Sequence, residues 1–207
     1  MRRLGFWSAL FLFGVGVAYI VTLAVGLATA GLTKPIVDPV LATMEVLTLL
    51  SAPLAVVTMS AVYSRASTDY RICSLVALIF MAMMAAATMS VHFVELTALR
   101  QMGSAGLAWP SVPYALELLA WDVFLGLSLL FAAPVFRGSR LEESVRVGML
   151  VAGSLCIAGT SGPALGDMRF QFIAVAGYVV VLPVVFLLLA LLFRRLPQPS
   201  LIRSPAG

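Results

Sequence analysis

Charged residues are scarce in this sequence. Only 11% of its 207 residues are Asp, Glu, Lys or Arg, whereas 62% are hydrophobic, and the mean hydropathy is +1.08. A soluble domain of this length does not need so much apolar surface, but a protein that crosses a membrane several times does. The basic residues behind the net charge of +4 stand in short turns between apolar runs. They form no patch for phosphates, which excludes nucleic acid as a partner.

Other absences exclude several function classes. The two cysteines, Cys73 and Cys156, form neither a CxxC pair nor a secreted-type framework, so we interpret both as small packing residues. No lysine lies inside an apolar run, which excludes a retinal Schiff base. No Ser-His-Asp signature, P-loop or dinucleotide fingerprint is present. A single histidine does not provide the two axial ligands that haem between helices normally takes, and we expect no cofactor.

Six long apolar runs divide the chain. Because a membrane helix needs about 20 apolar residues, each run predicts one spanning helix, and together they predict one all-α domain over residues 1–207. The predicted spans are 6–32, 40–63, 72–99, 114–136, 147–164 and 170–193, and the basic tail 194–207 is expected to be flexible. The first run could instead be a signal peptide, since Ala28-Thr29-Ala30 resembles a cleavage site. It is longer than a typical apolar signal core of about 7–15 residues, so we favour a retained span.

The basic residues also predict the orientation of the spans. Ten fall on the side of the termini: Arg2, Arg3, Arg65, Arg71, Arg137, Arg140, Arg146, Arg194, Arg195 and Arg203. Three fall on the opposite side: Lys34, Arg100 and Arg169. This asymmetry predicts that both termini are cytoplasmic. We expect a multi-pass protein of the cell membrane, specifically a bacterial inner membrane.

The third apolar run ends in the most informative stretch, which holds the only histidine. His92 and Glu95 are three positions apart and so lie side by side on one helix face, with Thr88 one turn earlier. Ionisable groups inside a membrane span are costly and usually face a partner or a cavity. The stretch therefore predicts a polar site inside the bundle.

Four carboxyl groups and His92 fall in the same half of the predicted bilayer. At about 1.5 Å per residue from the outer helix ends, Glu117 is about 6 Å deep, Glu95 about 8 Å, Glu45 about 9 Å, His92 about 12 Å and Asp122 about 14 Å. The inner half of the spans has no comparable charge. This one-sided arrangement favours an outer-leaflet pocket over a transport path, which needs access from both sides. Asp122 is expected to point away from Glu117, by about 140° around an α-helix.

Carboxyl groups crowded together in a low dielectric cannot all be ionised, and a protonated acid beside an imidazole suits general acid–base chemistry. The sequence therefore gives His92, Glu95, Glu117 and Glu45 as catalytic candidates. The alternative for each is a hydrogen-bonded contact that fixes helix packing. The same residue types also bind metals, but the second copy of a di-iron motif is missing, and we assign no metal.

A further set of residues is predicted to bind the substrate. The rings of Tyr114 and Trp121 could stabilise positive charge, although an interfacial anchor explains both rings equally well. Arg100 and Arg169 could form a rim for an anionic headgroup, and a solvated turn is the alternative for Arg169. Thr88 and Asp122 complete the set.

Three functional hypotheses follow. The first is an isomerase- or cyclase-type enzyme acting on a lipid or isoprenoid by protonation and deprotonation. Its combination of acids and a histidine in one leaflet is similar in chemistry to sterol isomerases and integral-membrane terpene cyclases, without a residue-by-residue match. The second is a proton-coupled carrier or binder of a hydrophobic small molecule, with membrane lipids as further partners. Six short spans enclose little volume, so under this second hypothesis the protein is expected to form a homo-oligomer. The third is an assembly subunit without chemistry.

Overall fold

Six long helices form the whole of the described structure. The computed structural model describes residues 2–31, 36–102 and 109–195, and it contains no strand among them. The long helices cover Arg2–Ala30, Val40–Arg65, Thr68–Leu99, Val112–Val135, Arg140–Leu165 and Met168–Arg195. Each is long and apolar enough to cross a membrane. The prediction of an all-α membrane bundle with six spans is therefore confirmed.

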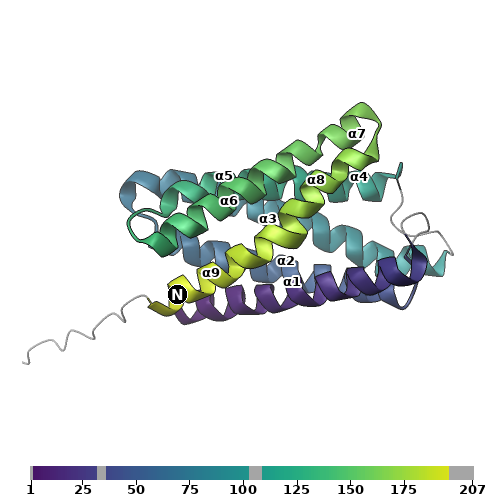
Figure 1. Ribbon diagram of the computed structural model, residues 1–207, viewed down its shortest axis with the longest axis horizontal. Helices are drawn as coiled ribbons and strands as arrows, with labels where there is room; N and C mark the ends of the chain where they lie inside the picture. The colour runs from purple at the N-terminus through teal and green to yellow at the C-terminus, as the bar shows by residue number, and fades with distance from the viewer. Residues whose placement is uncertain (1, 32–35, 103–108, 196–207) are drawn as a thin grey trace, which may run out of the picture.

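Several of these helices change their winding along their length. Figure 1 labels the resulting segments, and their bounds are as follows: α1 Arg2–Ala30, α2 Val40–Arg65, η1 Thr68–Tyr70, α3 Arg71–Val94, η2 Glu95–Leu99, α4 Val112–Leu118, η3 Leu119–Phe124, α5 Leu125–Ala132, η4 Ala133–Val135, α6 Arg140–Gly159, α7 Ser161–Leu165, η5 Met168–Phe170, α8 Gln171–Val175, η6 Ala176–Val181 and α9 Leu182–Arg195.

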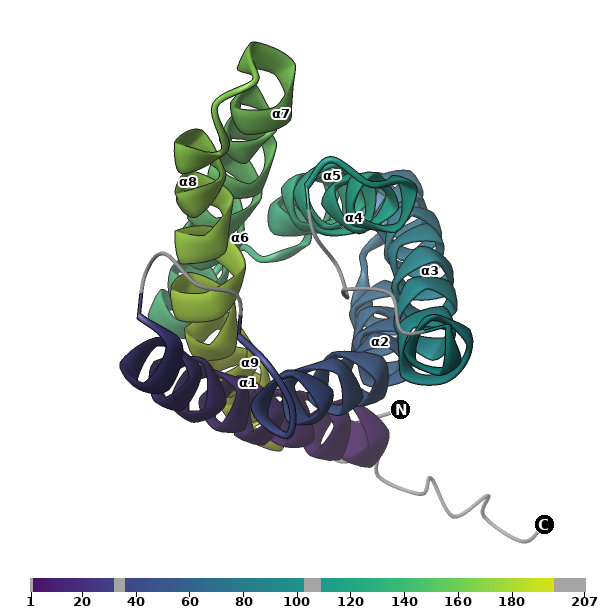
Figure 2. The same cartoon turned by 90° about the vertical axis from the view of Figure 1, so that its right-hand side faces the viewer.

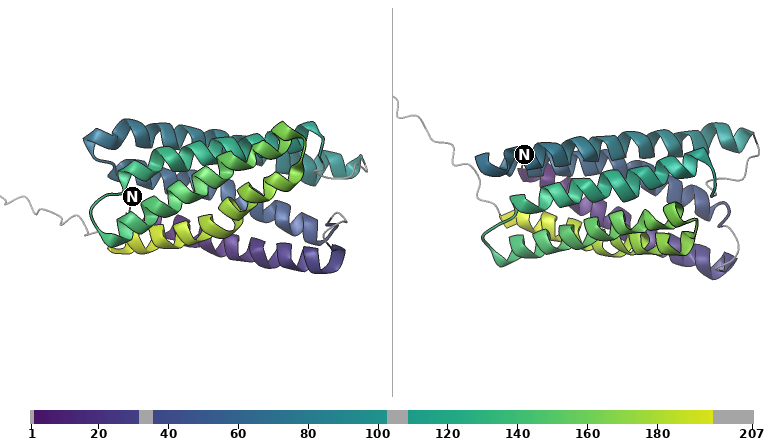
Figure 3. Two further views of the ribbon diagram at one scale, coloured as in Figure 1. Left: turned by 45° about the horizontal axis from the view of Figure 1, so that its top comes forward. Right: turned by 90° about the horizontal axis from the view of Figure 1, so that it is seen from above.

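The helices form a closed ring in chain order. Viewed along the bundle, α1, α2, α3, α4–α5, α6–α7 and α8–α9 follow one another, and α9 returns to pack against α1 (Figure 2). Neighbouring helices run antiparallel, as the views from two further sides also show (Figure 3). The beginning of α1 and the end of α9 consequently lie at the same end of the bundle (Figure 1).

One end of the bundle is densely packed. At the end near the termini, the buried side chains include Met59, Met81, Phe136, Met149 and Phe193. The outward faces are instead apolar and exposed, as the side chains of Phe11, Ile79, Phe93, Phe172 and Val184 illustrate. An apolar exterior around a packed interior is what a bilayer requires of a helical bundle.

The fifth helix begins earlier than its apolar run. The sequence predicted a span that begins at residue 147, but α6 starts at Arg140. Ser139 caps it: its hydroxyl accepts a hydrogen bond from the Glu142 N–H (3.2 Å), and the Glu142 carboxylate accepts one from the Ser139 N–H (3.0 Å). This capping box fixes a helix start in a polar segment, where hydropathy carries no signal. At the other terminus, α9 extends to Arg195, and the predicted flexible tail from residue 196 onward lies outside the described residues.

Three of the long helices in the described residues contain a π-helical turn. These turns are η2, η3 and η6. In η3 the Leu125 N–H bonds to the Ala120 carbonyl, and in η6 the Leu182 N–H bonds to the Gly177 carbonyl, each five residues back. Such single turns are often found at functional sites because they redirect side chains within an otherwise regular helix.

Candidate functional site

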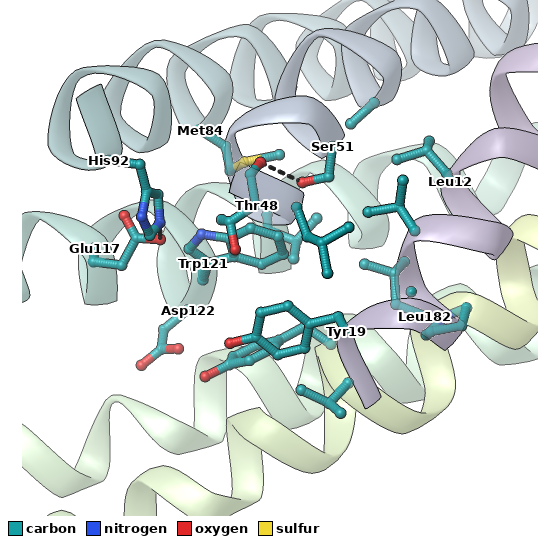
Figure 4. A pocket seen from close by; sticks show the side chains of 18 of the residues that line it. Leu12, Tyr19, Thr48, Ser51, Met84, His92, Glu117, Trp121, Asp122 and Leu182 are labelled. Carbon is teal, nitrogen blue, oxygen red and sulfur yellow. Dashed lines mark hydrogen bonds and ion pairs between the residues drawn. The ribbon is translucent and has the colours of Figure 1, made fainter. Parts of the chain in front are cut away.

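A cavity of about 230 Å³ lies inside the ring, in the half away from the termini. Its lining comes from every long helix except α6–α7, and its walls are mainly apolar (Figure 4). The polar and aromatic lining residues are Tyr19, Thr48, Ser51, His92, Tyr114, Glu117, Trp121, Asp122, Gln171, Tyr178 and Phe186. A concave, mostly apolar site with a few converging polar groups is the usual form of a small-molecule site.

His92 and Glu117 form the first polar pair of the cavity. The ring Nε2 of His92 lies 2.9 Å from the Oε1 of Glu117, and the two residues share a hydrogen bond between α3 and α4. The side chains are only 6% and 17% exposed. The second polar atoms, His92 Nδ1 and Glu117 Oε2, are buried and have no hydrogen-bond partner among the described residues. The pair thus retains unused hydrogen-bonding capacity beside the cavity.

Asp122 and Gln171 form the second polar pair. The Gln171 amide donates a hydrogen bond to Asp122 Oδ1 at 3.0 Å, joining η3 to α8. Both residues are buried, and Asp122 Oδ2 and Gln171 Oε1 have no partner within the described structure. A neutral amide stabilises a carboxylate by one hydrogen bond but does not neutralise its charge.

The π-helical turn η3 accounts for the position of Asp122. The sequence predicted that Asp122 would point away from Glu117, but both line the same cavity. The prediction assumed regular α-helical steps, whereas the backbone is π-helical from Leu119 to Phe124. A π-helical turn contains more residues than an α-helical turn, so a separation of five residues comes closer to one full turn. The value of about 140°, which rests on regular α-helical steps, therefore does not apply to this pair.

Glu45 and Glu95 are buried but do not line the cavity. Arg100 donates hydrogen bonds to Asp38 (2.8 Å) and to Glu45 (3.4 Å), which links the start of α2 to the end of η2. Glu95 stands at the start of η2, and its Oε1 has no partner in the described structure. The four predicted catalytic residues therefore divide into the cavity pair His92–Glu117 and two acids outside the lining, of which Glu45 is bound to Arg100.

Some of the predicted substrate-binding residues line the cavity and others do not. Tyr114 and Trp121 line the cavity, and the Trp121 ring lies 5.4 Å from that of Tyr178. Thr88 is buried outside the cavity lining, where its hydroxyl contacts the Met84 sulfur at 3.7 Å.

Arg169 lies at the surface and does not line the cavity. Its guanidinium is bound to Asp167 at 2.6–3.1 Å, and its side chain is 88% exposed. The hydrogen bonds from Arg169 lower the pKa of Asp167 to about 2. Both charges of this pair are satisfied within one turn, as expected of a solvated connection.

Among the polar and aromatic cavity residues, six were not predicted from the sequence: Tyr19, Thr48, Ser51, Gln171, Tyr178 and Phe186. The two tyrosines stand inside apolar runs, where aromatic residues are ordinary packing groups. Gln171 carried a usable signal, because a side-chain amide inside a membrane span usually has a polar partner.

No group of three or more His, Cys, Asp and Glu side chains within the described ranges is arranged to hold a metal ion. The cavity contains one histidine and two carboxyl groups, divided between two hydrogen-bonded pairs. No known protein family, curated protein or solved structure matches this chain. The chemistry of the site must therefore be argued from its own residues.

Proposed function

We propose that this chain is an integral membrane enzyme that moves a proton on the carbon skeleton of a lipid or isoprenoid bound in the cavity. One observation carries the proposal: a hydrogen-bonded histidine–carboxyl pair faces a concave and mainly apolar space, with its second polar atoms unpartnered within the described structure. Such a pair can donate and accept a proton without bulk water. Packing alone does not require an acid–base pair beside a cavity.

The proposed reaction is a double-bond shift. The protonated Glu117 carboxyl gives its proton to one carbon of a ligand double bond, whose π electrons form the new C–H bond. The neighbouring carbon becomes positively charged, and the rings of Trp121 and Tyr114 stabilise that charge. The carboxylate, oriented by His92, then removes a proton from an adjacent carbon, and those C–H electrons form the shifted double bond. The proton is returned, so no other reactant is consumed.

A groove on the outside of the bundle supports a ligand that comes from the membrane. It lies between α4 and the end of α6–α7 and is lined by Trp109, Ala115, Leu118, Leu119, Asp122, Val123, Thr160 and Pro163. Leu118 and Asp122 also line the cavity, so the two spaces are adjacent. A lipid-soluble substrate could therefore reach the site laterally without passing through water.

The orientation of the site belongs to the same proposal. The excess of basic residues on the side of the bundle that carries the termini favours a cytoplasmic location for that side. The cavity would then lie in the outer leaflet. A proton-coupled carrier is the second candidate, and it would need access from both ends. The packed side chains of Met59, Met81, Phe136 and Phe193 fill the opposite half, which favours a one-sided enzyme.

Deuterium incorporation tests this function even while the substrate is unidentified. The protein is purified in its native lipids and incubated in D₂O, and the extracted lipids are analysed by mass spectrometry. We expect one lipid or isoprenoid species to gain deuterium at carbon, and Glu117→Gln to reduce the rate by about 100-fold or more.

The matched control is Glu143→Gln, which removes an exposed carboxyl group outside the cavity. This variant should incorporate deuterium at the wild-type rate. If no species gains carbon-bound deuterium above a heat-inactivated sample, the proposed proton transfer is wrong.

A further inference from the structure

The charges of the cavity indicate the kind of ligand that it accepts. Its lining contains the carboxyl groups of Glu117 and Asp122, and within the described ranges no lysine or arginine. Arg100, which follows η2 on the same helix as His92, is already bound to Asp38 and Glu45. An anionic headgroup would therefore be buried beside carboxyl groups without a cationic partner, which is strongly unfavourable.

Asp122 is the part of the lining that most requires a partner. It is fully buried, and its Oδ1 is bound by an uncharged amide, while its Oδ2 has no partner in the described structure. Among the described lining residues His92 is the only basic side chain, and it is hydrogen-bonded to Glu117 instead. A buried carboxylate without a counter-charge is costly, and a cationic ligand group would remove that cost.

Aromatic rings line the same cavity as Asp122. Trp121 precedes Asp122 in η3, its ring lies 5.4 Å from that of Tyr178, and Tyr19 lines the same cavity (Figure 4). Ring faces attract organic cations, and aromatic cages are a common way to bind ammonium groups. Toward the packed half, the apolar side chain of Leu12 lines the cavity, and this part suits the apolar tail of a ligand.

We infer that the cavity selects amphiphilic organic cations, with the positive group between Asp122 and the rings of Trp121, Tyr19 and Tyr178. The inference rests on the proposed function in one respect, because the ligand occupies the same cavity as the proposed substrate. It adds the ligand class: a lipophilic amine or quaternary ammonium compound binds tightly, and so do cationic intermediates formed from a neutral lipid. Fatty acids and lipid phosphates are rejected.

The test uses three probes that share a ten-carbon chain: decyltrimethylammonium, 1-decanol and decanoate. Binding is measured by calorimetry on the full-length protein in nanodiscs of zwitterionic lipid, with empty nanodiscs subtracted for partition into the bilayer. We expect the cation to bind at least about 10-fold more tightly than the alcohol, and decanoate not to bind.

Two substitutions locate the cation. Asp122→Asn keeps the shape and the hydrogen bond to Gln171, and it should weaken binding of decyltrimethylammonium about 10-fold or more without weakening that of decanol. Trp121→Leu should also weaken binding of decyltrimethylammonium without weakening that of decanol. Trp121→Phe keeps an aromatic ring and should bind the cation more tightly than Trp121→Leu does. Equal affinity of the wild type for the cation and the alcohol would overturn the inference. So would unchanged cation binding in both Asp122→Asn and Trp121→Leu.

The outcome is separable from that of the deuterium experiment. Deuterium incorporation without cation selectivity would contradict this inference and leave the enzyme proposal standing. Cation selectivity without deuterium incorporation would support this inference and contradict the enzyme.

Discussion

At the scale of single residues, Glu117 and Glu95 differ in what they face. Glu117 lines the cavity and bonds to His92, while Glu95 is buried outside the lining, and its Oε1 is unpartnered among the described residues. Both were catalytic candidates by depth in the bilayer, and depth does not distinguish them. The side-chain direction does, because only a group that reaches the ligand can exchange a proton with it.

The first prediction compares these two acids. Glu95→Gln should keep most of the deuterium-incorporation activity and change the free energy of unfolding by about 1–2 kcal/mol, the scale of an altered buried polar contact. Glu117→Gln should unfold at nearly the wild-type temperature but lose about 100-fold or more of the activity. The melting temperature and the activity are measured on the same preparations. Loss of activity in the folded Glu95→Gln variant would return Glu95 to the catalytic group.

At the scale of helices, the contact between α6 and α8 positions the second polar pair. Gly159 lies against Ala174, and a Cβ built on Gly159 would stand 2.3 Å from the Ala174 Cβ and 3.0 Å from its backbone nitrogen. Ala174 is in the same short helix as Gln171, whose amide holds Asp122. Close packing at this glycine therefore fixes the position of the amide donor, as small residues commonly do in membrane helices.

The second prediction uses this glycine and a matched control. Gly159→Ala should separate α6 from α8, destabilise the fold by about 1–3 kcal/mol and weaken binding of decyltrimethylammonium, because Gln171 moves relative to Asp122. Gly14→Ala also adds a methyl group to a helical glycine, but its Cβ would meet nothing within 4 Å. It should fold and bind as the wild type does. Thermal unfolding and calorimetry check both, and an undisturbed Gly159→Ala variant would show that this contact does not position the amide.

The helices also show where prediction from the sequence ends. Apolar runs near the length of a bilayer identified six spans, and the polar residues in them identified His92, Glu117 and Asp122 as inward-facing groups. The π-helical turns gave no sequence signal, so the angle predicted between Glu117 and Asp122 did not take them into account. Tyr19 and Tyr178 were not found because a ring that lines a cavity and a ring that fills a core have the same sequence pattern.

At the scale of the whole molecule, the antiparallel ring brings both ends of the described chain to one side (Figure 1). The cavity lies in the other half, and the packed core lies between it and the termini. The proposed outer-leaflet site therefore depends on the orientation of the entire bundle, which the basic residues predict.

The third prediction concerns this orientation. A reporter fused after Arg203 should be active in the cytoplasm, and one inserted in the connection between η2 and α4 should be external. The ten-to-three distribution of basic residues gives the reason. Paired cytoplasmic and external reporters, such as a fluorescent protein and an alkaline phosphatase, provide the measurement at each position. The reverse pattern would move the cavity to the cytoplasmic leaflet.

The central claim is that His92 and Glu117 act as one acid–base unit on a ligand in the cavity, and a double-mutant cycle tests it most directly. Deuterium incorporation is measured for the wild type, His92→Gln, Glu117→Gln and the double variant, each corrected for folded protein. Groups that act together are strongly non-additive. We expect each single variant to lose about 100-fold or more and the double variant to lose little beyond that. Full activity in Glu117→Gln, or losses that simply multiply in the double variant, would contradict the claim.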